Sequence, residues 1–220
     1  MNLQQKFDYK PLERIDRPDG RKYLVNGQEL SSVTTILSAT KDMTYLTEWR
    51  NAVGETEANR IVTESSNLGS NIHNILEDYV RGKEMRGQYM ALTLAKLIIK
   101  KGLCNVDEIW GAEVSLYSEG LFAGTTDLVG LHNGIPAIMD YKNSRQEKTK
   151  EMIEDYFMQL AAYSIAHNEM FGTNIKKGVI MMVTRAGKYL EFIIEGDEFT
   201  KYEIMWANKV CAYYDTCGRD

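Results

Sequence analysis

A strand that is apolar on both faces and then ends abruptly in charges is the feature of this sequence that most constrains its fold. Residues 135–139 read Ile-Pro-Ala-Ile-Met, a run expected of a strand covered on both sides of its sheet. Asp140, Tyr141 and Lys142 follow directly. Because side chains alternate along a strand, Asp140 and Lys142 project to the same side, roughly 7 Å apart. The sequence therefore predicts a buried strand that carries two charged groups at its end.

The order of the predicted elements indicates an α/β fold. The Asn26-Gly27 pair favours a hairpin turn between residues 21–25 and 28–30. Helices are predicted over 33–66, 67–82, 88–101, 151–171 and 197–214. Strands are predicted over 109–117, 123–131, 135–142, 177–184 and 189–195.

These elements predict a small mixed β-sheet flanked by helices. The chain has 220 residues, which is the length of one domain, and no repeat or linker divides it. We therefore expect a single domain over 1–220. Within it, 1–105 form the hairpin and helical part, and 106–220 form a β-β-β-α-β-β-α core.

Composition and charge exclude several classes of protein. With 44% apolar and 26% charged residues, the chain does not have the composition of a disordered protein. No apolar stretch approaches the roughly 20 residues of a membrane span, so we expect no membrane partner. The start of the chain lacks the pattern of a targeting peptide, and we expect a cytoplasmic location, in a bacterial cell or in the host of a phage. The net charge of −5 argues against a protein that coats DNA passively, but less against an enzyme with metal in an acidic pocket.

Two aspartates on neighbouring predicted strands suggest a metal site. Asp127 lies in the strand before Asp140, and a hairpin around 132–134 brings both carboxylates to one end of the sheet. Carboxylates that share a site repel one another unless a cation lies between them, and oxygen ligands suit Mg²⁺ or Mn²⁺. Lys142 could then orient or deprotonate an attacking water and stabilise charge on a phosphoryl oxygen. The alternative is a surface salt bridge at a strand end.

Further polar residues favour the site over the salt bridge. Glu113 is an acid in a β-rich run, Gln159 and Tyr163 are one helical turn apart, and His73 lies beside an apolar helical stripe. Each has an alternative interpretation, as a solvated strand residue, a polar helix-face residue or a structural histidine. Together they point to one constellation.

The combination of these motifs resembles the PD-(D/E)xK superfamily of nucleases. The resemblance rests on Glu113, Gly124-x-x-Asp127, Asp140-Tyr-Lys142 and Gln159-x-x-x-Tyr163. The upstream histidine and the Gln-x-x-x-Tyr element are similar to the RecB-like exonuclease branch, and within it to the mitochondrial genome maintenance exonuclease group with its phage and bacterial relatives. The similarity runs from residues 32–37 to the last helix. It implies a restriction-endonuclease-like α/β fold in which an N-terminal helical region covers the active site.

The resemblance also implies a role for each motif residue. His73, Asp127, Asp140 and the backbone carbonyl of Tyr141 would bind Mg²⁺ or Mn²⁺. Lys142 would be the catalytic lysine, Glu113 an accessory acid, and Gln159 and Tyr163 would position the lysine or the scissile phosphate. Some members of the branch carry an iron–sulfur cluster on four cysteines. This chain has three cysteines, so we expect no cluster.

Residues outside the motifs are candidates for contacts with a DNA strand. Ser32 and Thr34 belong to the resembling segment 32–37, and Trp49 could stack on a base. Asn143 stands where many relatives have threonine, so a hydroxyl contact would pass to Ser144. Arg145 belongs to a segment, 141–150, in which four basic residues face one acidic residue.

The resemblance therefore implies a metal-dependent DNA exonuclease that hydrolyses phosphodiester bonds, acts on single strands and serves DNA replication, recombination or repair. One alternative is a non-catalytic nucleic-acid-binding module that keeps the fold. Another is a globular domain whose acids form structural ion pairs and which acts through protein partners. A metal requirement for turnover distinguishes the first of these from the nuclease.

Overall fold

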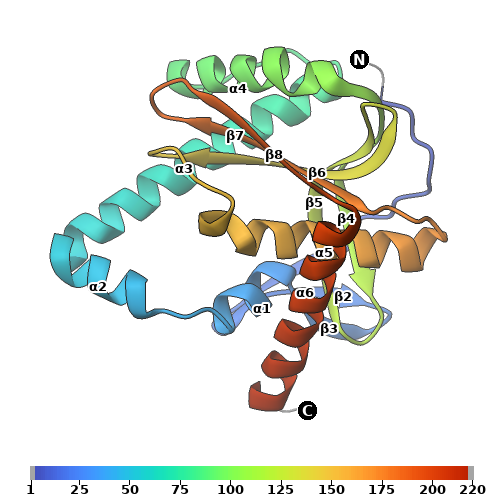
Figure 1. Ribbon diagram of the computed structural model, residues 1–220, viewed down its shortest axis with the longest axis horizontal. Coiled ribbons are helices and arrows are strands. Elements are labelled where there is room, and N and C mark those ends of the chain that lie inside the picture. The colour runs from blue at the N-terminus through green and yellow to red at the C-terminus, as the bar shows by residue number, and fades with distance from the viewer. Residues whose placement is uncertain (1–2, 218–220) are drawn as a thin grey trace.

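Two sheets, six α-helices and two short 3-10 helices, Leu103–Asn105 and Glu151–Ile153, make up the part of the chain that the computed structural model describes (Figure 1). This part is residues 3–217 without the side chains of Tyr45 and Cys217. The small sheet has the order β1 (Glu13–Arg17), β2 (Gly20–Val25), β3 (Gln28–Ser31). The central sheet has the order β4 (Val106–Ser118), β5 (Phe122–His132), β6 (Ile135–Ser144), β7 (Lys177–Thr184), β8 (Tyr189–Glu195). The helices are α1 (Val33–Ala39), α2 (Thr44–Val53), α3 (Glu55–Val80), α4 (Tyr89–Lys101), α5 (Glu154–Phe171) and α6 (Gly196–Cys217). Within these residues, none of the helices combines the length and apolar character needed to cross a bilayer.

The central sheet is mixed. Neighbouring strands are antiparallel except β6 and β7, which run parallel and are connected through α5. A parallel pair needs such a crossover connection, and the helix of the crossover covers one face of the sheet. The structure confirms the predicted α/β fold with a mixed sheet flanked by helices.

Helices cover both faces of the sheet because successive residues of its central strands are buried on opposite sides. Ile138 of β6 belongs to the core that α1, α5 and α6 share with the sheet. Met139 and Tyr141 belong to the core on the other face, under α3 and α4. In Figure 1, α3 and α4 lie above the sheet, whereas α5, α1 and the small sheet lie below it. This alternation places Asp140 and Lys142 on the α5 side of β6.

The first half of the chain differs from the sequence prediction in two respects. Residues 33–66 and 67–82 were expected as separate helical regions, but α3 runs unbroken from Glu55 to Val80. The breaks lie earlier, between α1 and α2 and at Gly54, where a φ of +85° separates α2 from α3. Strand β1 was not predicted, because its residues are mostly charged and exposed. Backbone pairing with β2, rather than burial, holds β1 in place. The Asn26-Gly27 hairpin was predicted correctly.

The close approach of β4 and β5 depends on Gly130. A Cβ at this position would lie 2.0 Å from the backbone carbonyl oxygen of Glu108, beside a register shift in the pairing. We expect Gly130→Ala to lower the free energy of unfolding by at least about 2 kcal/mol, because strand backbone would have to move. Urea denaturation measures this, with the half-buried Ser115→Ala in the same strand pair as the control. Equal midpoints for the two variants would contradict the explanation.

Candidate active site

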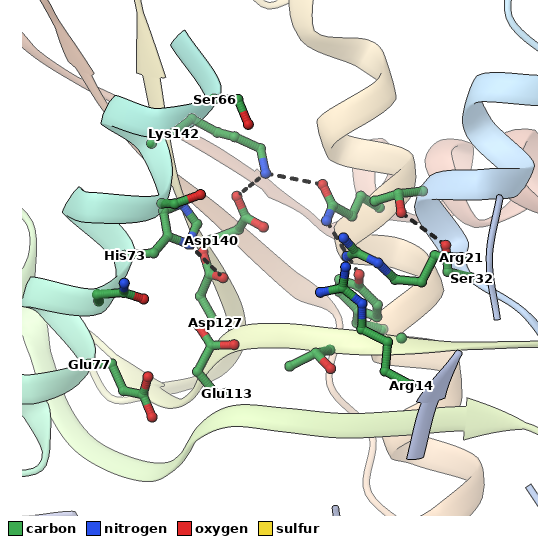
Figure 2. A pocket seen from close by; sticks show the side chains of 18 of the residues that line it. Arg14, Arg21, Ser32, Ser66, His73, Glu77, Glu113, Asp127, Asp140 and Lys142 are labelled. Atoms are coloured by element: carbon green, nitrogen blue, oxygen red, sulfur yellow. Dashed lines mark hydrogen bonds and ion pairs between the residues drawn. The ribbon is translucent and has the colours of Figure 1, made fainter. Parts of the chain in front are cut away.

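A pocket of about 570 Å³ opens between α3, the small sheet and the α5 side of strands β4–β6 (Figure 2). Its lining includes His73 from α3, Asp140 from β6, Gln159 from α5 and Arg21 from β2. Carboxylates and an imidazole gather on one wall, and arginines lie on the opposite wall. The pocket is therefore strongly polarised.

Asp127 and Asp140 lie side by side on adjacent strands, as the sequence predicts. The hairpin register pairs Leu128 with Met139, so the next position on each strand is an aspartate. Both side chains are almost completely withdrawn from solvent, at 9% and 2% exposed. Burial and the charge of Asp127 raise the pKa of Asp140 to about 6. The backbone N–H of Tyr141 donates a hydrogen bond of 2.7 Å to Asp127 and ties the two strands together here.

His73 reaches this pair of carboxylates from α3. Its Nδ1 lies 3.2 Å from Asp127 Oδ1, and its Nε2 lies 2.9 Å from the carbonyl oxygen of Tyr141. Both partners are acceptors, so the ring satisfies both when it is a doubly protonated imidazolium. Burial lowers the pKa of His73, but the charge of Asp127 and the hydrogen bond to it outweigh burial and raise the pKa to about 9.

Glu113 completes the acidic wall from β4. It stands opposite Asp127 between the Ala112–Leu128 and Val114–Thr126 pairs, and its backbone is left-handed, with φ +53°. Such a conformation is costly for a residue with a side chain and tends to occur at functional sites. Partial desolvation and then the charge of Asp127 raise the pKa of Glu113 to about 7.

These residues could hold a metal ion. One ligand atom each of His73, Glu113 and Asp127 lies within 4.8 Å of the others. Imidazole and carboxylate are common ligands of divalent ions, and a cation would relieve the repulsion that raises the pKa of Glu113 and Asp140. The donor set therefore fits the group that the resemblance implies. Glu113, expected as an accessory acid, lies inside the cluster, whereas the carboxylate of Asp140 contacts Lys142.

Lys142 is held by a chain of polar contacts. Its Nζ lies 2.5 Å from Asp140 Oδ2 and donates a hydrogen bond of 3.2 Å to Gln159 Oε1. Gln159 Nε2 in turn donates to the hydroxyl of Tyr163 at 3.3 Å. Burial lowers the pKa of Lys142, but the charges of Asp140 and Asp127 outweigh it and raise the pKa above its usual value. The side chain is therefore an ammonium cation at neutral pH in this arrangement, suited to stabilising negative charge rather than to removing a proton.

Two glycines let the elements approach closely enough to form the site. A Cβ on Gly124 would lie 2.8 Å from the ring of Tyr163, so α5 packs directly on β5 here. A Cβ on Gly69 would lie 2.8 Å from Asn143 Oδ1, so α3 packs directly on β6. The spacing of Gly69 and His73, one helical turn apart, puts the close approach and the imidazole on the same face of α3.

The structure brings most of the sequence candidates to the pocket. Its lining includes Ser32, Thr34, His73, Glu113, Asp127, Asp140, Lys142, Gln159 and Tyr163. Tyr141 contributes its backbone carbonyl, while its side chain is buried in the core under α3 and α4.

Three of the residues suggested for DNA contacts are not brought to this lining. Trp49 is half-buried on α2, Ser144 is half-buried at the end of β6, and Arg145 is exposed in the following loop. Asn143, rather than Ser144, faces the pocket. A role for these three in binding stays a prediction.

Sequence reasoning missed two groups in the lining. On α3, Ser66, Ser70 and Glu77 line the pocket together with His73. Their spacing of three and four residues about His73 was a readable signal for one polar helical face. Arg14 and Arg21 come from the small sheet, and no motif marked them.

Comparison with known proteins gives a likeness of fold. Neither a protein-family model nor a curated protein matches the sequence. The structure is similar to that of a "putative exonuclease" from Eubacterium rectale, with a TM-score of 0.50 and 12% identity over 69% of this chain and 68% of the other. It is also similar to a protein named SSO0001, with a TM-score of 0.45 and 16% identity over 87% of this chain and 79% of the other. At these identities the likeness to the Eubacterium rectale protein concerns the fold.

Metal affinity should rise with pH. Ligands bind a cation in their unprotonated form, and the metal-free site holds protons on His73 up to about pH 9 and on Glu113 up to about pH 7. We expect Mn²⁺ to bind more tightly at pH 8 than at pH 6 and to release about one proton per ion at pH 8, the proton of His73. Isothermal titration calorimetry in buffers of different ionisation enthalpy counts the released protons. Equal release by wild type and His73→Asn at pH 8 would contradict this assignment.

Removing the charge of Glu113 should stabilise the metal-free protein. Its raised pKa means that ionisation in the folded state costs stability, which is lost as pH rises from about 4.5 to about 7. In EDTA, Glu113→Gln should be more stable than wild type by about 1 kcal/mol at pH 8, after allowance for solvent screening, and equal to it at pH 4. Thermal unfolding measures the difference.

Two further variants separate charge from backbone strain. Glu113→Gly removes the charge and also permits the left-handed φ, so it should exceed Glu113→Gln in stability at pH 4, where charge no longer matters. Glu119→Gln is the matched control, because Glu119 is an exposed turn residue outside the pocket lining. A stability of Glu113→Gln below that of wild type at pH 8 would overturn the repulsion argument.

Proposed function

We propose that the protein is a divalent-metal-dependent nuclease that hydrolyses phosphodiester bonds in single-stranded DNA. The observation that carries this proposal is the convergence of His73, Glu113, Asp127 and Asp140 with the ammonium of Lys142 in one pocket. The fold shared with a "putative exonuclease" supports it, as does the motif resemblance in the sequence. A binding module or a structural ion-pair network has no need for carboxylates that repel one another.

The cation would be held by His73, Glu113 and Asp127, with Asp140 and the carbonyl of Tyr141 beside them. Oxygen-rich donors suit Mg²⁺ or Mn²⁺. Such an ion supplies Lewis-acid polarisation of a phosphoryl oxygen and lowers the pKa of water. Asp127 orients His73 through the 3.2 Å contact, and its second oxygen stays anchored on the backbone of β6.

Lys142 supplies the fixed positive charge of the mechanism. Its ammonium lies next to Asp140 and is positioned by Gln159, which Tyr163 holds from the next helical turn. In this position it stabilises the negative charge that develops on a phosphoryl oxygen during attack. Because its pKa is raised, the charge is present before substrate arrives and needs no rearrangement.

The size of the pocket favours a single strand. A volume of about 570 Å³ is that of a small-molecule site and accommodates a nucleotide or two of an extended strand. This argument supports action at single strands or frayed ends, and with the resemblance it supports an exonuclease.

The proposal is tested with end-labelled single- and double-stranded DNA, blocked at each end in turn, with and without Mg²⁺. We expect degradation of single strands that needs Mg²⁺ and that falls by at least about 100-fold in Lys142→Ala, the scale of losing one preorganised charge. Lys176→Ala is the matched control, because Lys176 is an exposed lysine paired with Glu203 on α6. Digestion by Lys142→Ala at the rate of wild type would refute the proposal, and so would binding of DNA without any turnover.

A further inference from the structure

Two arginines of the small sheet lie across the pocket from the possible metal ligands His73, Glu113 and Asp127. Arg14 of β1 and Arg21 of β2 both line the pocket, and Figure 2 shows their guanidinium groups directed inward from the side opposite His73 and Glu113. We propose that Arg14 and Arg21 form an anion subsite that holds a second, non-scissile phosphate of the substrate strand. This inference rests on the proposed function and extends it to how the strand is positioned.

Strand pairing selects which face of the small sheet carries the subsite. In the β1–β2 register, Arg14 stands opposite Tyr23, and Asp16 stands opposite Arg21. Alternation along a strand therefore puts Arg14, Arg21 and Tyr23 on one face, and this face lines the pocket. Arg17 belongs to the other face, where it pairs with Glu29.

The backbone of Arg21 is fixed to helix α1. Its N–H donates to Thr35 Oγ1 at 2.9 Å, and its carbonyl accepts hydrogen bonds of 2.9 Å from Ser32 N and from Thr35 Oγ1. The residue before it, Gly20, is the first of β2 and has a φ of +133°. Its position has no room for a Cβ, because Thr35 Cγ2 would lie 2.5 Å away. The guanidinium of Arg21 thus starts from a backbone held firmly against the domain.

The charges of Arg14, Arg21 and Asp16 sum to a net positive charge. Asp16 accepts two hydrogen bonds from Arg14 Nη2, at 3.0 and 2.9 Å, and lies 3.7 Å from Arg21 Nε. Among the described residues, Arg21 Nε is buried without a hydrogen-bond partner. Two guanidinium groups therefore share one carboxylate, which leaves one unit of positive charge on this side of the pocket.

A phosphodiester is the anion that suits this arrangement. The planar donor fork of arginine matches phosphate oxygens, whereas the opposite wall, with Glu77, Glu113 and Asp127, repels any anion that no cation accompanies. A strand that places one phosphate at the metal cluster can extend a neighbouring phosphate to the arginines. The two walls together would then fix the register of the strand.

Salt dependence of binding tests the subsite without turnover. The background is Asp140→Asn, with fluorescence anisotropy of a short labelled single-stranded DNA measured over a series of salt concentrations. Each phosphate neutralised on a single strand contributes a slope of about 0.7 in log K against log salt. Adding Arg21→Gln or Arg14→Gln should reduce the slope by about 0.7 and weaken binding by about tenfold at low salt. Arg17→Gln, on the other face, should leave both unchanged.

Modified DNA identifies which phosphate of the strand the arginines contact. A neutral methylphosphonate is moved one position at a time along the strand. At one position it should weaken binding of the Asp140→Asn protein and have no further effect when Arg21→Gln is also present. Strands with a 5′-phosphate, a 3′-phosphate or hydroxyl ends show whether that phosphate is terminal or internal. Additive losses at every position would overturn the subsite.

Kinetics in the otherwise wild-type protein separate the two proposals. Arg21→Gln should raise KM for single-stranded DNA about tenfold and leave kcat nearly unchanged, because the contact is made equally before and during reaction. Arg21→Lys should restore much of the salt slope, since it restores the charge. If wild type degrades DNA and Arg21→Gln matches Arg17→Gln, only the subsite is wrong. If wild type neither binds nor degrades DNA, the proposed function itself is wrong.

Discussion

Electrostatic repulsion between buried carboxylates is the constraint on which the organisation of this protein depends. Asp127 and Asp140 occupy neighbouring positions on two central strands, and Glu113 faces them from a third. An opposite charge lies beside each of the two buried aspartates, His73 for Asp127 and Lys142 for Asp140, whereas Glu113 is exposed. The helices that supply or position these cations, α3 and α5, are therefore tied to the sheet by charge as well as by packing.

The parallel pair at the centre of the sheet gives this arrangement its geometry. The crossover from β6 to β7 lays α5 along the face that carries Asp140 and Lys142, so Gln159 of α5 contacts the lysine. On the opposite face, Met139 and Tyr141 are packed beneath α3 and α4. Strand β6 thus contributes Met139 and Tyr141 to the core and Asp140 and Lys142 to the pocket.

The features that could be predicted from the sequence are those that depend on a local residue pattern. Strands 177–184 and 189–195 were predicted with their observed limits, because both are β-type runs that flank a turn at Ala186-Gly187. The juxtaposition of Asp127 and Asp140 followed from a short hairpin. Glu113 was expected as an accessory acid, but its ligand atom within 4.8 Å of those of His73 and Asp127 depends on a left-handed residue inside a strand, which propensity disfavours. Arg14 and Arg21 were not predicted as pocket residues, because only the tertiary packing of the small sheet beside the pocket brings them there.

The length of α3 has a mechanical consequence. The helix has 26 residues, so it is about 39 Å long, and most of its buried residues lie between Leu68 and Val80. In Figure 1, the first turns of α3 and the adjoining α2 extend beyond the sheet. Because α3 is one continuous helix that contains His73, a tilt of its outer turns would also displace the imidazole relative to the sheet. Such a displacement would change the 3.2 Å contact between His73 and Asp127.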